Sequence, residues 1–279
     1  MRRVLAEDIT VAVRRMCMET NFNLPEDVRR SIRAAYERED SGTGKEILDL
    51  IMRNFEIAGA ERIPVCQDTG AACVFVEYGQ EVNVEGSLED AINEGVRQGY
   101  VQGYLRKSIV GDPLRRENTG DNTPAMIHYD IVPGDKLKIT VAPKGFGSEN
   151  MSRIAMLLPS DGIEEIKAFV LETVELAGPN PCPPIIVGVG IGGTFDKAPL
   201  IAKKALLRET DDAHPDPFYA RLEGELLDAI NALGIGPQGY GGRTTALAVK
   251  VAAMATHIAG LPVAVNINCH AARHIHEVL

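Results

Sequence analysis

Pro64-Val65-Cys66-Gln67-Asp68-Thr69-Gly70-Ala71-Ala72-Cys73-Val74-Phe75-Val76 is the stretch around which this sequence is organised. A thiol, an amide, a carboxylate and a hydroxyl occupy its four consecutive positions from Cys66 to Thr69. The run Ala72–Val76 that follows is apolar and is typical of a strand. The four polar side chains therefore stand at the entrance to a predicted strand, and the ends of elements are where sites are usually built.

Two further cysteines stand alone in similarly confined surroundings far along the chain. One is in Pro181-Cys182-Pro183-Pro184, and the other, Asn268-Cys269-His270, follows a predicted strand. We predict that the thiolates of Cys66, Cys182 and Cys269 converge on one metal site. The sequence contains no Cys-x-x-Cys pair, which disfavours zinc ribbons, thioredoxin-type motifs and ferredoxin-type clusters.

Burial as a small apolar side chain is the alternative explanation for any free cysteine. We favour it for Cys17, which lies between two methionines in a predicted helix, and for Cys73, which lies in the predicted strand. Three histidines near Cys269, at positions 270, 274 and 276, could mark a separate metal site. A solvated terminal segment explains these histidines more simply.

The composition is that of a globular protein that binds neither nucleic acid nor membranes. Of its 279 residues 45% are apolar, and the formal net charge is -10. Binding to nucleic acid or to anionic membranes needs positive fields, although a local basic pocket for an anionic substrate remains open. We find no secretory signal, and five cysteines do not make a disulfide scaffold, so we expect a cytoplasmic, reduced protein.

Hydrophobic spacing and turn residues predict an alternation of helices and short strands, and therefore an α/β (mixed α+β) fold around the metal site. We expect one domain over 1–279, with a helical N-terminal subregion at about 1–60. Later helices are predicted at Ser87–Tyr100, Asp161–Leu176, Pro199–Leu207, Tyr219–Leu233 and, as a buried helix, Thr244–Ala255. Strands are predicted at Ala72–Val76, Met126–Val132, Leu137–Val141, Pro184–Val189 and Leu261–Ile267.

The glycines of Gly188-Val189-Gly190-Ile191-Gly192-Gly193 match the G-x-G-x-x-G pattern of dinucleotide-binding proteins. The next helix is not followed by a strand ending in an acidic residue, because residues 209–219 form a loop rich in Asp and Pro. We therefore prefer a tight turn whose backbone N–H groups face an anion or a cluster sulfide. A nucleotide-binding module near Gly188 remains the alternative from a different functional class.

Five motifs, taken in order along the chain, resemble those of the class I, iron–sulfur-dependent fumarate hydratase family. They are Pro64–Gly70, Asn118–Ala125, Lys144–Asn150, Cys182–Pro184 with Gly192–Thr194, and Asn268–Ala271. The resemblance covers nearly the whole chain, but only the N-terminal, cluster-bearing part of the single-chain enzymes. The chain is therefore similar to the α subunit of the two-subunit forms, either fumarate hydratase or the related L(+)-tartrate dehydratase.

This resemblance implies that Cys66, Cys182 and Cys269 are the ligands of a 4Fe–4S cluster. Three thiolates leave one iron open, and an open iron is a Lewis acid for a substrate carboxylate and hydroxyl. Asp68 is then expected to be the general acid at the departing hydroxyl, with Gln67 beside it.

The resemblance also implies which residues bind the substrate. Arg106 and His257 match the family's contacts to the substrate carboxylates, and both are expected to contribute to catalysis together with Asp68. Cations opposite a dicarboxylate also explain how an acidic protein can hold a dianion. Gly145 and Gly147 are expected to let backbone N–H groups approach the substrate.

The part of the single-chain enzymes that supplies the proton-abstracting base is not matched by this chain. We therefore expect activity only with a β subunit, in an α2β2 hetero-oligomer. The expected reaction interconverts (S)-malate with fumarate and water. The alternative within the family is the dehydration of L(+)-tartrate to oxaloacetate.

Overall fold

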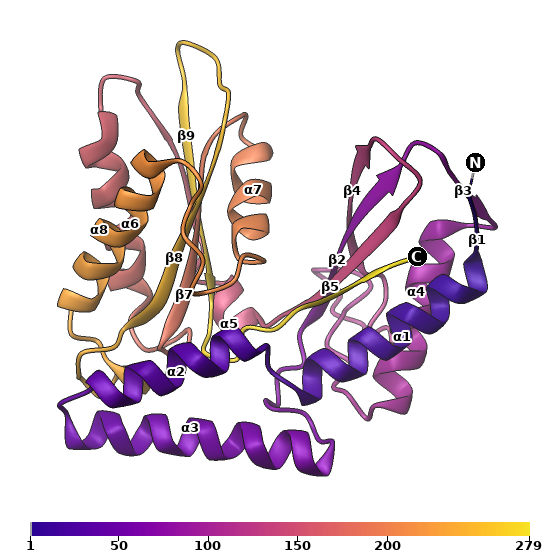
Figure 1. Cartoon of the computed structure of the whole chain (residues 1–279), viewed down its shortest axis with the longest axis horizontal. Coiled ribbons are helices and arrows are strands. Elements are labelled where there is room, and N and C mark those ends of the chain that lie inside the picture. Colours follow the sequence, from indigo (N-terminus) through magenta and orange to yellow (C-terminus); the bar gives the residue numbers. More distant parts are fainter. Residues whose placement is uncertain (1) are drawn as a thin grey trace. The chain divides into compact units, whose positions relative to one another are not determined.

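Helices and strands alternate along most of the chain in the computed structural model, which describes residues 2–279 (Figure 1). The predicted mixed class of helices and strands is therefore confirmed. The chain divides into two compact units. The first contains the described residues up to Pro25, Asn54–Phe146 and Arg273–Leu279, and the second contains Glu26–Arg53 and Gly147–Ala272.

Three helices occupy the N-terminal sixty residues, as the hydrophobic spacing predicts. They are α1 (Ala6–Phe22), α2 (Glu26–Arg38) and α3 (Gly42–Glu61). One boundary between the units falls between Pro25 and Glu26, so α1 belongs to the first unit and α2 to the second, and another falls inside α3 between Arg53 and Asn54. None of the helices within residues 2–279 is long and apolar enough to cross a membrane.

The first unit is built on a four-stranded sheet with the order β10-β5-β2-β4. Helices α1 and α4 (Leu88–Gln102) pack against each other, and their apolar side chains share one core with this sheet. A two-stranded parallel sheet, β1 with β3, completes the unit. The strands are β1 (Arg2–Leu5), β2 (Ala71–Gly79), β3 (Val82–Glu85), β4 (Met126–Val132), β5 (Leu137–Lys144) and β10 (Ile275–Val278).

Small residues let α1 and α4 approach closely. A Cβ atom at Gly95 would lie 2.7 Å from Val13 Cβ, and one at Gly99 would lie 2.8 Å from Cys17 Cβ. The start of α4 is set by its predicted cap, because the Ser87 side chain accepts a hydrogen bond from the backbone N–H of Asp90 at 3.2 Å. Local sequence therefore determines both where this helix begins and how near it lies to α1.

Strands β4 and β5 are both present as predicted, but they do not pair with each other. Strand β2 lies between them, parallel to β4 and antiparallel to β5. The turn after β4 passes across the end of β2, where Gly79 N donates to Lys136 O at 3.0 Å and Gln80 N donates to Val132 O at 2.9 Å. The returning strand therefore takes a neighbour from much earlier in the chain.

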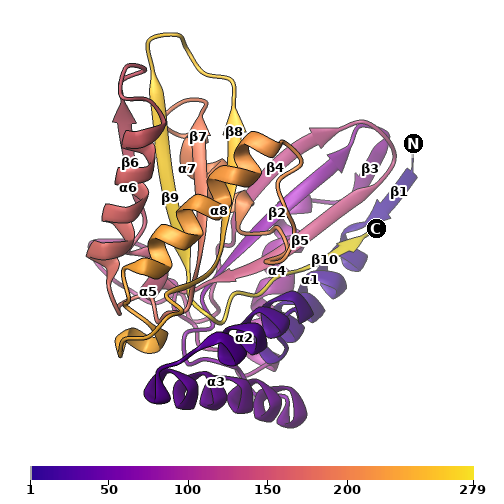
Figure 2. The same ribbon diagram turned by 60° about the vertical axis from the view of Figure 1, so that its left-hand side comes forward.

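The second unit is a three-layer arrangement around a four-stranded sheet with the order β6-β9-β7-β8. Helices α6 and α8 cover one face, and α7 covers the other (Figures 1 and 2). The helices are α6 (Gly162–Ala177), α7 (Lys197–Ala205) and α8 (Pro217–Ala232), with the short α5 (Phe146–Glu149) and the 3-10 turn η1 (Pro237–Gly239). The strands are β6 (Arg153–Leu157), β7 (Ile185–Gly192), β8 (Ala246–Met254) and β9 (Leu261–Asn268).

The glycines near Gly188 have a packing function. Gly188 and Gly190 lie inside β7, and a Cβ atom at either would come within 2.2 Å of a carbonyl oxygen of α7, that of Ala202 or Ala198. The expected tight turn facing an anion is therefore wrong for these two residues. A dinucleotide fingerprint opens a helix after a strand, whereas this pattern begins within the strand, so the structure gives it a different explanation.

The stretch predicted as a buried helix, Thr244–Ala255, is instead strand β8. This prediction was wrong because β8 is covered by helices on both faces, and such strands are apolar at nearly every position. A short continuous apolar run cannot be distinguished from a buried helix by its periodicity. Strands β1, β3, β6 and β10 were not predicted either, and each has only four or five residues.

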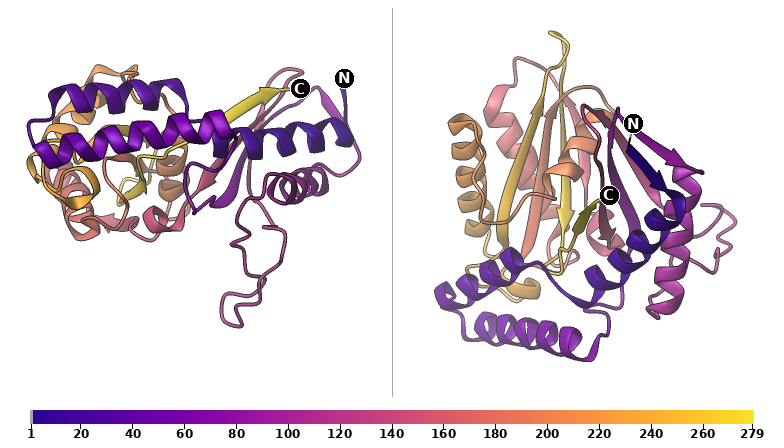
Figure 3. Two further views of the ribbon diagram at one scale, coloured as in Figure 1. Left: turned by 90° about the horizontal axis from the view of Figure 1, so that it is seen from below. Right: turned by 45° about the vertical axis from the view of Figure 1, so that its right-hand side comes forward.

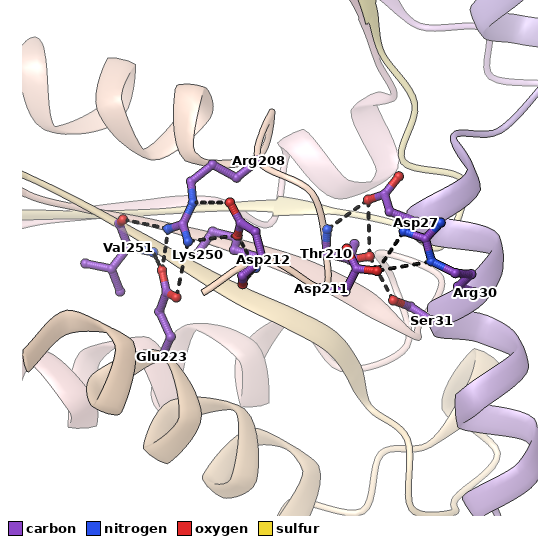
Figure 4. Close-up of polar contacts among 10 residues, drawn as sticks. All are labelled: Asp27, Arg30, Ser31, Arg208, Thr210, Asp211, Asp212, Glu223, Lys250 and Val251. Carbon is purple, nitrogen blue, oxygen red and sulfur yellow. Dashed lines mark hydrogen bonds and ion pairs between the residues drawn. The ribbon is translucent and has the colours of Figure 1, made fainter. Parts of the chain in front are cut away.

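A polar network fixes the loop that follows α7 to its surroundings in the second unit (Figure 4). The buried ammonium of Lys250 on β8 donates to the carboxylate of Asp212 at 2.7 Å, and Arg208 binds both Asp212 and Glu223. At the other end of the loop, Thr210 N donates to Asp27 Oδ2 on α2 at 2.8 Å. The loop thus connects α2 to the sheet.

Glu39 anchors the end of α2 to the glycine-rich loop before β8. Its buried carboxylate accepts hydrogen bonds from four backbone N–H groups, those of Asp40, Ser41, Arg243 and Thr244, at 3.0 to 3.1 Å. Burial raises the pKa of Glu39, but these N–H donors outweigh it, so the net pKa is lowered. The charged form is therefore the one that holds this loop.

We expect Glu39→Ala to lower the free energy of unfolding by about 3 kcal/mol, because it leaves buried backbone donors without a partner. Urea denaturation at neutral pH measures the change. Glu37→Ala, two residues earlier on an exposed face of the same helix, serves as the matched control and should leave stability nearly unchanged. Equal effects of the two substitutions would contradict the anchoring function of Glu39.

Candidate functional site

The loop before β2 holds Asp68 in a defined position in the first unit. Its Oδ1 accepts a hydrogen bond from Gly70 N at 3.0 Å, and its Oδ2 accepts one from Phe146 N at 2.8 Å. The backbone N–H of Asp68 points to Cys66 Sγ at 3.4 Å. The carboxylate and the predicted thiolate ligand are therefore neighbours on one rigid turn, and each carboxylate oxygen keeps a lone pair for a ligand.

Two glycines let two separate motifs meet at this carboxylate. Gly70 has a φ of +76°, and a Cβ atom there would lie 2.7 Å from the backbone of Lys144. A Cβ atom at Gly145 would lie 3.2 Å from Asp68 Oδ2. Larger residues at either position would separate the motif containing Cys66 from the one containing Lys144.

Sequence reasoning missed the residues that support this loop from behind. Arg273 is buried, and its guanidinium donates to Asp68 O at 2.9 Å and to Asn21 Oδ1 at 3.0 Å. The hydroxyl of Tyr100 donates to Thr69 O at 2.8 Å, and burial raises its pKa well above the ordinary value, so it remains a donor. The prediction of a solvated terminal segment is thus partly wrong, because Arg273 within this segment is buried and supports the loop that holds Asp68.

Arg106 is held next to the same loop by its backbone. Thr69 Oγ1 donates to Arg106 O at 3.1 Å, while the Arg106 side chain is exposed. Gln67 is exposed too. Asn122 fastens the loop further, because its Nδ2 donates to Gly70 O at 3.1 Å and its Oδ1 accepts from Ser108 N at 2.7 Å. The first unit therefore brings Cys66, Gln67, Asp68 and Arg106 together.

The loop between α4 and β4 extends away from the helices of its unit (Figure 3, left). It is tied back by Asp121, whose carboxylate accepts from Arg97 Nε at 2.8 Å and from Thr123 Oγ1 at 2.7 Å. Burial raises the pKa of Asp121, but the hydrogen bonds from Arg97 and Thr123 lower it by more, so the net pKa is about 2. An ionised Asp121 is therefore favoured by the folded state.

In the second unit, the antiparallel pairing of β7 with β9 brings two cysteine-bearing loops together. Ile186 is opposite Asn268, so Cys182 before β7 and Cys269 after β9 lie at the same end of the sheet. The Nδ1 atom of His270 lies 2.9 Å from Cys182 O, so the residue after Cys269 contacts the backbone of the other cysteine.

Residues of the Lys144–Asn150 motif extend into the second unit and contact the neighbourhood of these loops. Glu149 accepts from Asn266 Nδ2 at 2.8 Å, near the end of β9 that precedes Cys269. At Gly147 a Cβ atom would lie 3.6 Å from Asn180 O, two residues before Cys182. Gly147 therefore lies next to the loop that contains Cys182, and Glu149 lies next to the strand that leads to Cys269.

His257 lies at the other end of the same sheet. It follows β8, whose last residue, Met254, pairs with Gly192 at the end of β7, whereas Cys182 precedes β7. Eight strand residues span about 26 Å, so the sheet separates His257 from Cys182 and Cys269. Its exposed ring borders an apolar cavity of about 390 Å³ between the ends of α6 and α8.

The five cysteines fall into two groups by their exposure. Cys17 and Cys73 are buried, as predicted, and burial raises the pKa of Cys17 to about 12. Cys66, Cys182 and Cys269 are all at least partly exposed. The three predicted ligands are thus the accessible thiols, which fits a group that must be inserted from solvent.

These three cysteines are divided between the two units, with Cys66 in the first and the other two in the second. Within residues 2–279 no three His, Cys, Asp or Glu side chains form a group arranged to hold a single metal ion.

We expect Asp121→Asn to lower the free energy of unfolding by about 1 kcal/mol at neutral pH, because it removes the charge that Arg97 binds. The folded-state pKa is depressed, so this stabilisation is present above about pH 4 and is lost as the pH falls towards 2. Urea denaturation at several pH values follows the difference. Asp135→Asn, in an exposed turn, is the control, and a difference that does not narrow with falling pH would contradict the assignment.

We expect an alkylating reagent to modify Cys66, Cys182 and Cys269 in the folded, cluster-free chain and to spare Cys17 and Cys73 until denaturant is added. The reason is that a buried thiol is both inaccessible and protonated. Mass spectrometry of peptides locates each modification. Labelling of Cys17 in the folded chain, as fast as that of Cys182, would contradict the division into two groups.

Comparisons with known proteins identify the family of this chain. Residues 10–278 match the family model described as fumarate hydratase (Fumerase). A Methanocaldococcus jannaschii protein named "Putative L(+)-tartrate dehydratase subunit alpha" is 45% identical over 262 residues, which are 91% of this chain and 92% of that protein. The L(+)-tartrate dehydratase subunit alpha of Escherichia coli strain K12 and that of Shigella sonnei are each 34% identical over 254 residues, 90% of this chain and 84% of theirs. The chain belongs to the fumarate hydratase family and corresponds to its α subunits.

Proposed function

We propose that this chain is the α subunit of an iron–sulfur-dependent hydro-lyase that interconverts (S)-malate with fumarate and water. The observation that carries the proposal is the position of Asp68, held by Gly70 N and Phe146 N next to the accessible thiol of Cys66. A carboxyl group fixed beside a metal ligand can transfer a proton to or from a hydroxyl bound at that metal.

The proposed cofactor is a 4Fe–4S cluster held by Cys66, Cys182 and Cys269. Such a cluster, with one iron free of protein ligands, supplies the Lewis acid that makes hydroxide a tolerable leaving group. The accessible set of thiols and the shared end of β7 and β9 support this ligand assignment. Membership of the family supports the iron–sulfur dependence.

The remaining assignments concern how the substrate is bound. Asp68 delivers the proton to the departing hydroxyl, and Gln67 beside it offers an exposed amide to the substrate. Arg106 offers an exposed guanidinium to a carboxylate, and its backbone is fixed to Thr69. Gly145 leaves room for a ligand next to Asp68, because any side chain there would crowd its Oδ2. Gly147 has the corresponding function near the Cys182 loop.

His257 of a second α chain is proposed as a further contact to a substrate carboxylate, with a catalytic contribution, because within one chain this residue lies a full strand length from Cys182 and Cys269, farther than a small dicarboxylate reaches. Its Nδ1 accepts from Ala259 N at 3.2 Å, which orients the ring and leaves Nε2 toward solvent-exposed surroundings. The sheet separates it from Cys182 and Cys269. His257→Asn therefore tests a part of the proposal that is independent of Asp68, through KM separately from kcat.

Dehydration of L(+)-tartrate to oxaloacetate is the second candidate activity. It is favoured by the names of the relatives from Methanocaldococcus, Escherichia and Shigella. Malate and tartrate differ by a single hydroxyl group, and both are 2-hydroxy dicarboxylates that the same groups could bind. The names of these relatives, which are all α subunits, also support a β subunit as partner. We propose an α2β2 assembly in which the β subunit supplies the proton-abstracting base.

Anaerobic co-expression with the candidate β chain tests the proposal. We expect about four iron and four sulfide per α chain, which is the composition of the proposed cluster, and turnover of malate faster than that of tartrate. Asp68→Asn should lower kcat by about 10²- to 10⁴-fold while iron content is retained. Asp135→Asn, in an exposed turn, is the matched control and should leave kcat unchanged.

Three outcomes separate the parts of this proposal. Iron binding with preferential tartrate turnover would replace the substrate and keep the mechanism. Robust turnover by the α chain alone would remove the need for a β subunit. Absence of iron from the anaerobically purified complex, together with NAD binding, would overturn the hydro-lyase assignment in favour of a nucleotide-binding module.

A further inference from the structure

Strand β4 is an edge strand of the sheet in the first unit (Figure 1). The order β10-β5-β2-β4 places β4 at the end, paired in parallel with β2 along all seven of its residues. Among the described residues, no strand pairs with its other edge. Such an edge presents a row of backbone N–H and C=O groups that can add another strand.

The side chains of β4 offer little protection against such pairing. Edge strands are usually protected by charged side chains, especially lysine, by proline or by a bulge, and of these Met126-Ile127-His128-Tyr129-Asp130-Ile131-Val132 contains only the carboxylate of Asp130. Its exposed positions are apolar or aromatic, with Met126 42%, Tyr129 47% and Ile131 74% exposed. This edge therefore has the character of a surface that is covered in the assembled protein.

We propose that β4 pairs with β4 of a second copy of this chain, antiparallel and about a two-fold axis at Tyr129. This inference does not rest on the proposed activity. The second copy is chosen as the partner because the strand is complementary to itself in this register. His128 then faces Asp130 of the other copy, Ile127 faces Ile131, Met126 faces Val132, and Tyr129 faces Tyr129.

Neighbouring registers are less favourable for physical reasons. Side chains along a strand alternate between the two faces of the sheet. A two-fold axis perpendicular to the sheet keeps each face on its own side, so two directly opposite residues must have their side chains on the same face. Only an axis that passes through a residue meets this condition. An axis at Asp130 would place two aspartates directly opposite each other, and like charges in that position are destabilising. An axis at His128 would set the two histidines opposite each other and leave Asp130 facing Met126. Of these three axes, only the one at Tyr129 sets each Asp130 carboxylate opposite a His128 ring, which can donate a hydrogen bond to it.

One of these side chains is already oriented by a contact within its own chain. The His128 ring stacks on Phe75 of β2, with ring centroids 5.1 Å apart. The ring therefore loses less side-chain freedom when the strand pairs with a second copy.

Disulfide cross-linking of the full chain tests the register. Under mild oxidation, we expect Tyr129→Cys to form a link between positions 129 of two copies, because directly opposite residues have Cβ atoms about 5 Å apart. Ile131→Cys is the matched control. It is more exposed, yet in this register the two positions 131 lie about 13 Å apart along the strands, so it should not link to itself.

The wild-type chain measures the background from its own accessible thiols, and peptide mapping identifies each link. Linking of Ile131→Cys to itself as fast as Tyr129→Cys would overturn the proposed register. The same two variants are also co-expressed with the β chain. Linking of position 129 to the β chain, instead of to a second α chain, would assign this edge to the other subunit and overturn the proposal.

A charge exchange gives an independent test by sedimentation equilibrium. His128→Asp places aspartates opposite each other twice, and we expect it to raise the dimer dissociation constant about tenfold or more. The double variant His128→Asp with Asp130→His restores both pairs of a histidine opposite an aspartate and should recover most of the loss. Thermal unfolding shows whether each variant remains folded. A wild-type chain that is monomeric at high micromolar concentration, or a dimer that His128→Asp leaves unchanged, would contradict the proposal.

Discussion

The hydrogen bond from Phe146 N to Asp68 Oδ2 is the interaction on which the candidate site of the first unit depends. It joins two motifs that are almost eighty residues apart, and it does so through a backbone donor that every residue except proline carries. What is specific is the space around it. Gly70 and Gly145 remove the side chains that would hold the two segments apart. Close backbone approach therefore places the carboxylate, and Arg273 and Tyr100 fix the loop from behind.

In the second unit, the pairing of strands determines which candidate site residues lie close together. Because β7 and β9 are antiparallel, residues before one strand meet residues after the other, which brings the Cys182 and Cys269 loops together. The same geometry sends His257 to the far end, since β8 is parallel to β7 and His257 follows it. Direction of strands, rather than distance along the chain, decides which of the candidate residues are neighbours. Gly188 and Gly190 serve this sheet by admitting α7 at close range.

Exposure separates the cysteines more clearly than their sequence context does. Cys17 and Cys73 are surrounded by apolar neighbours in both sequence and structure, and both are buried. Cys182 and Cys269 are next to prolines, asparagine and histidine, and they remain accessible. A thiol can become a ligand only where it can lose its proton and be reached. The accessible set therefore gives the family relationship a chemical counterpart in this chain, while its metal remains a proposal.

The amino-acid sequence alone determined the mixed class, the helices of the first sixty residues, the capped start of α4 and the five ordered motifs, because caps, turns and 3.6-residue spacing are local signals. It could not distinguish β8 from a helix, since a strand covered on both faces loses its alternation. Only the tertiary structure placed β2 between β4 and β5, revealed Arg273 behind Asp68 and separated His257 from the cysteine loops. Those facts depend on which distant strands pair and in which direction, and pairing is decided by packing of the whole unit, which no local pattern records.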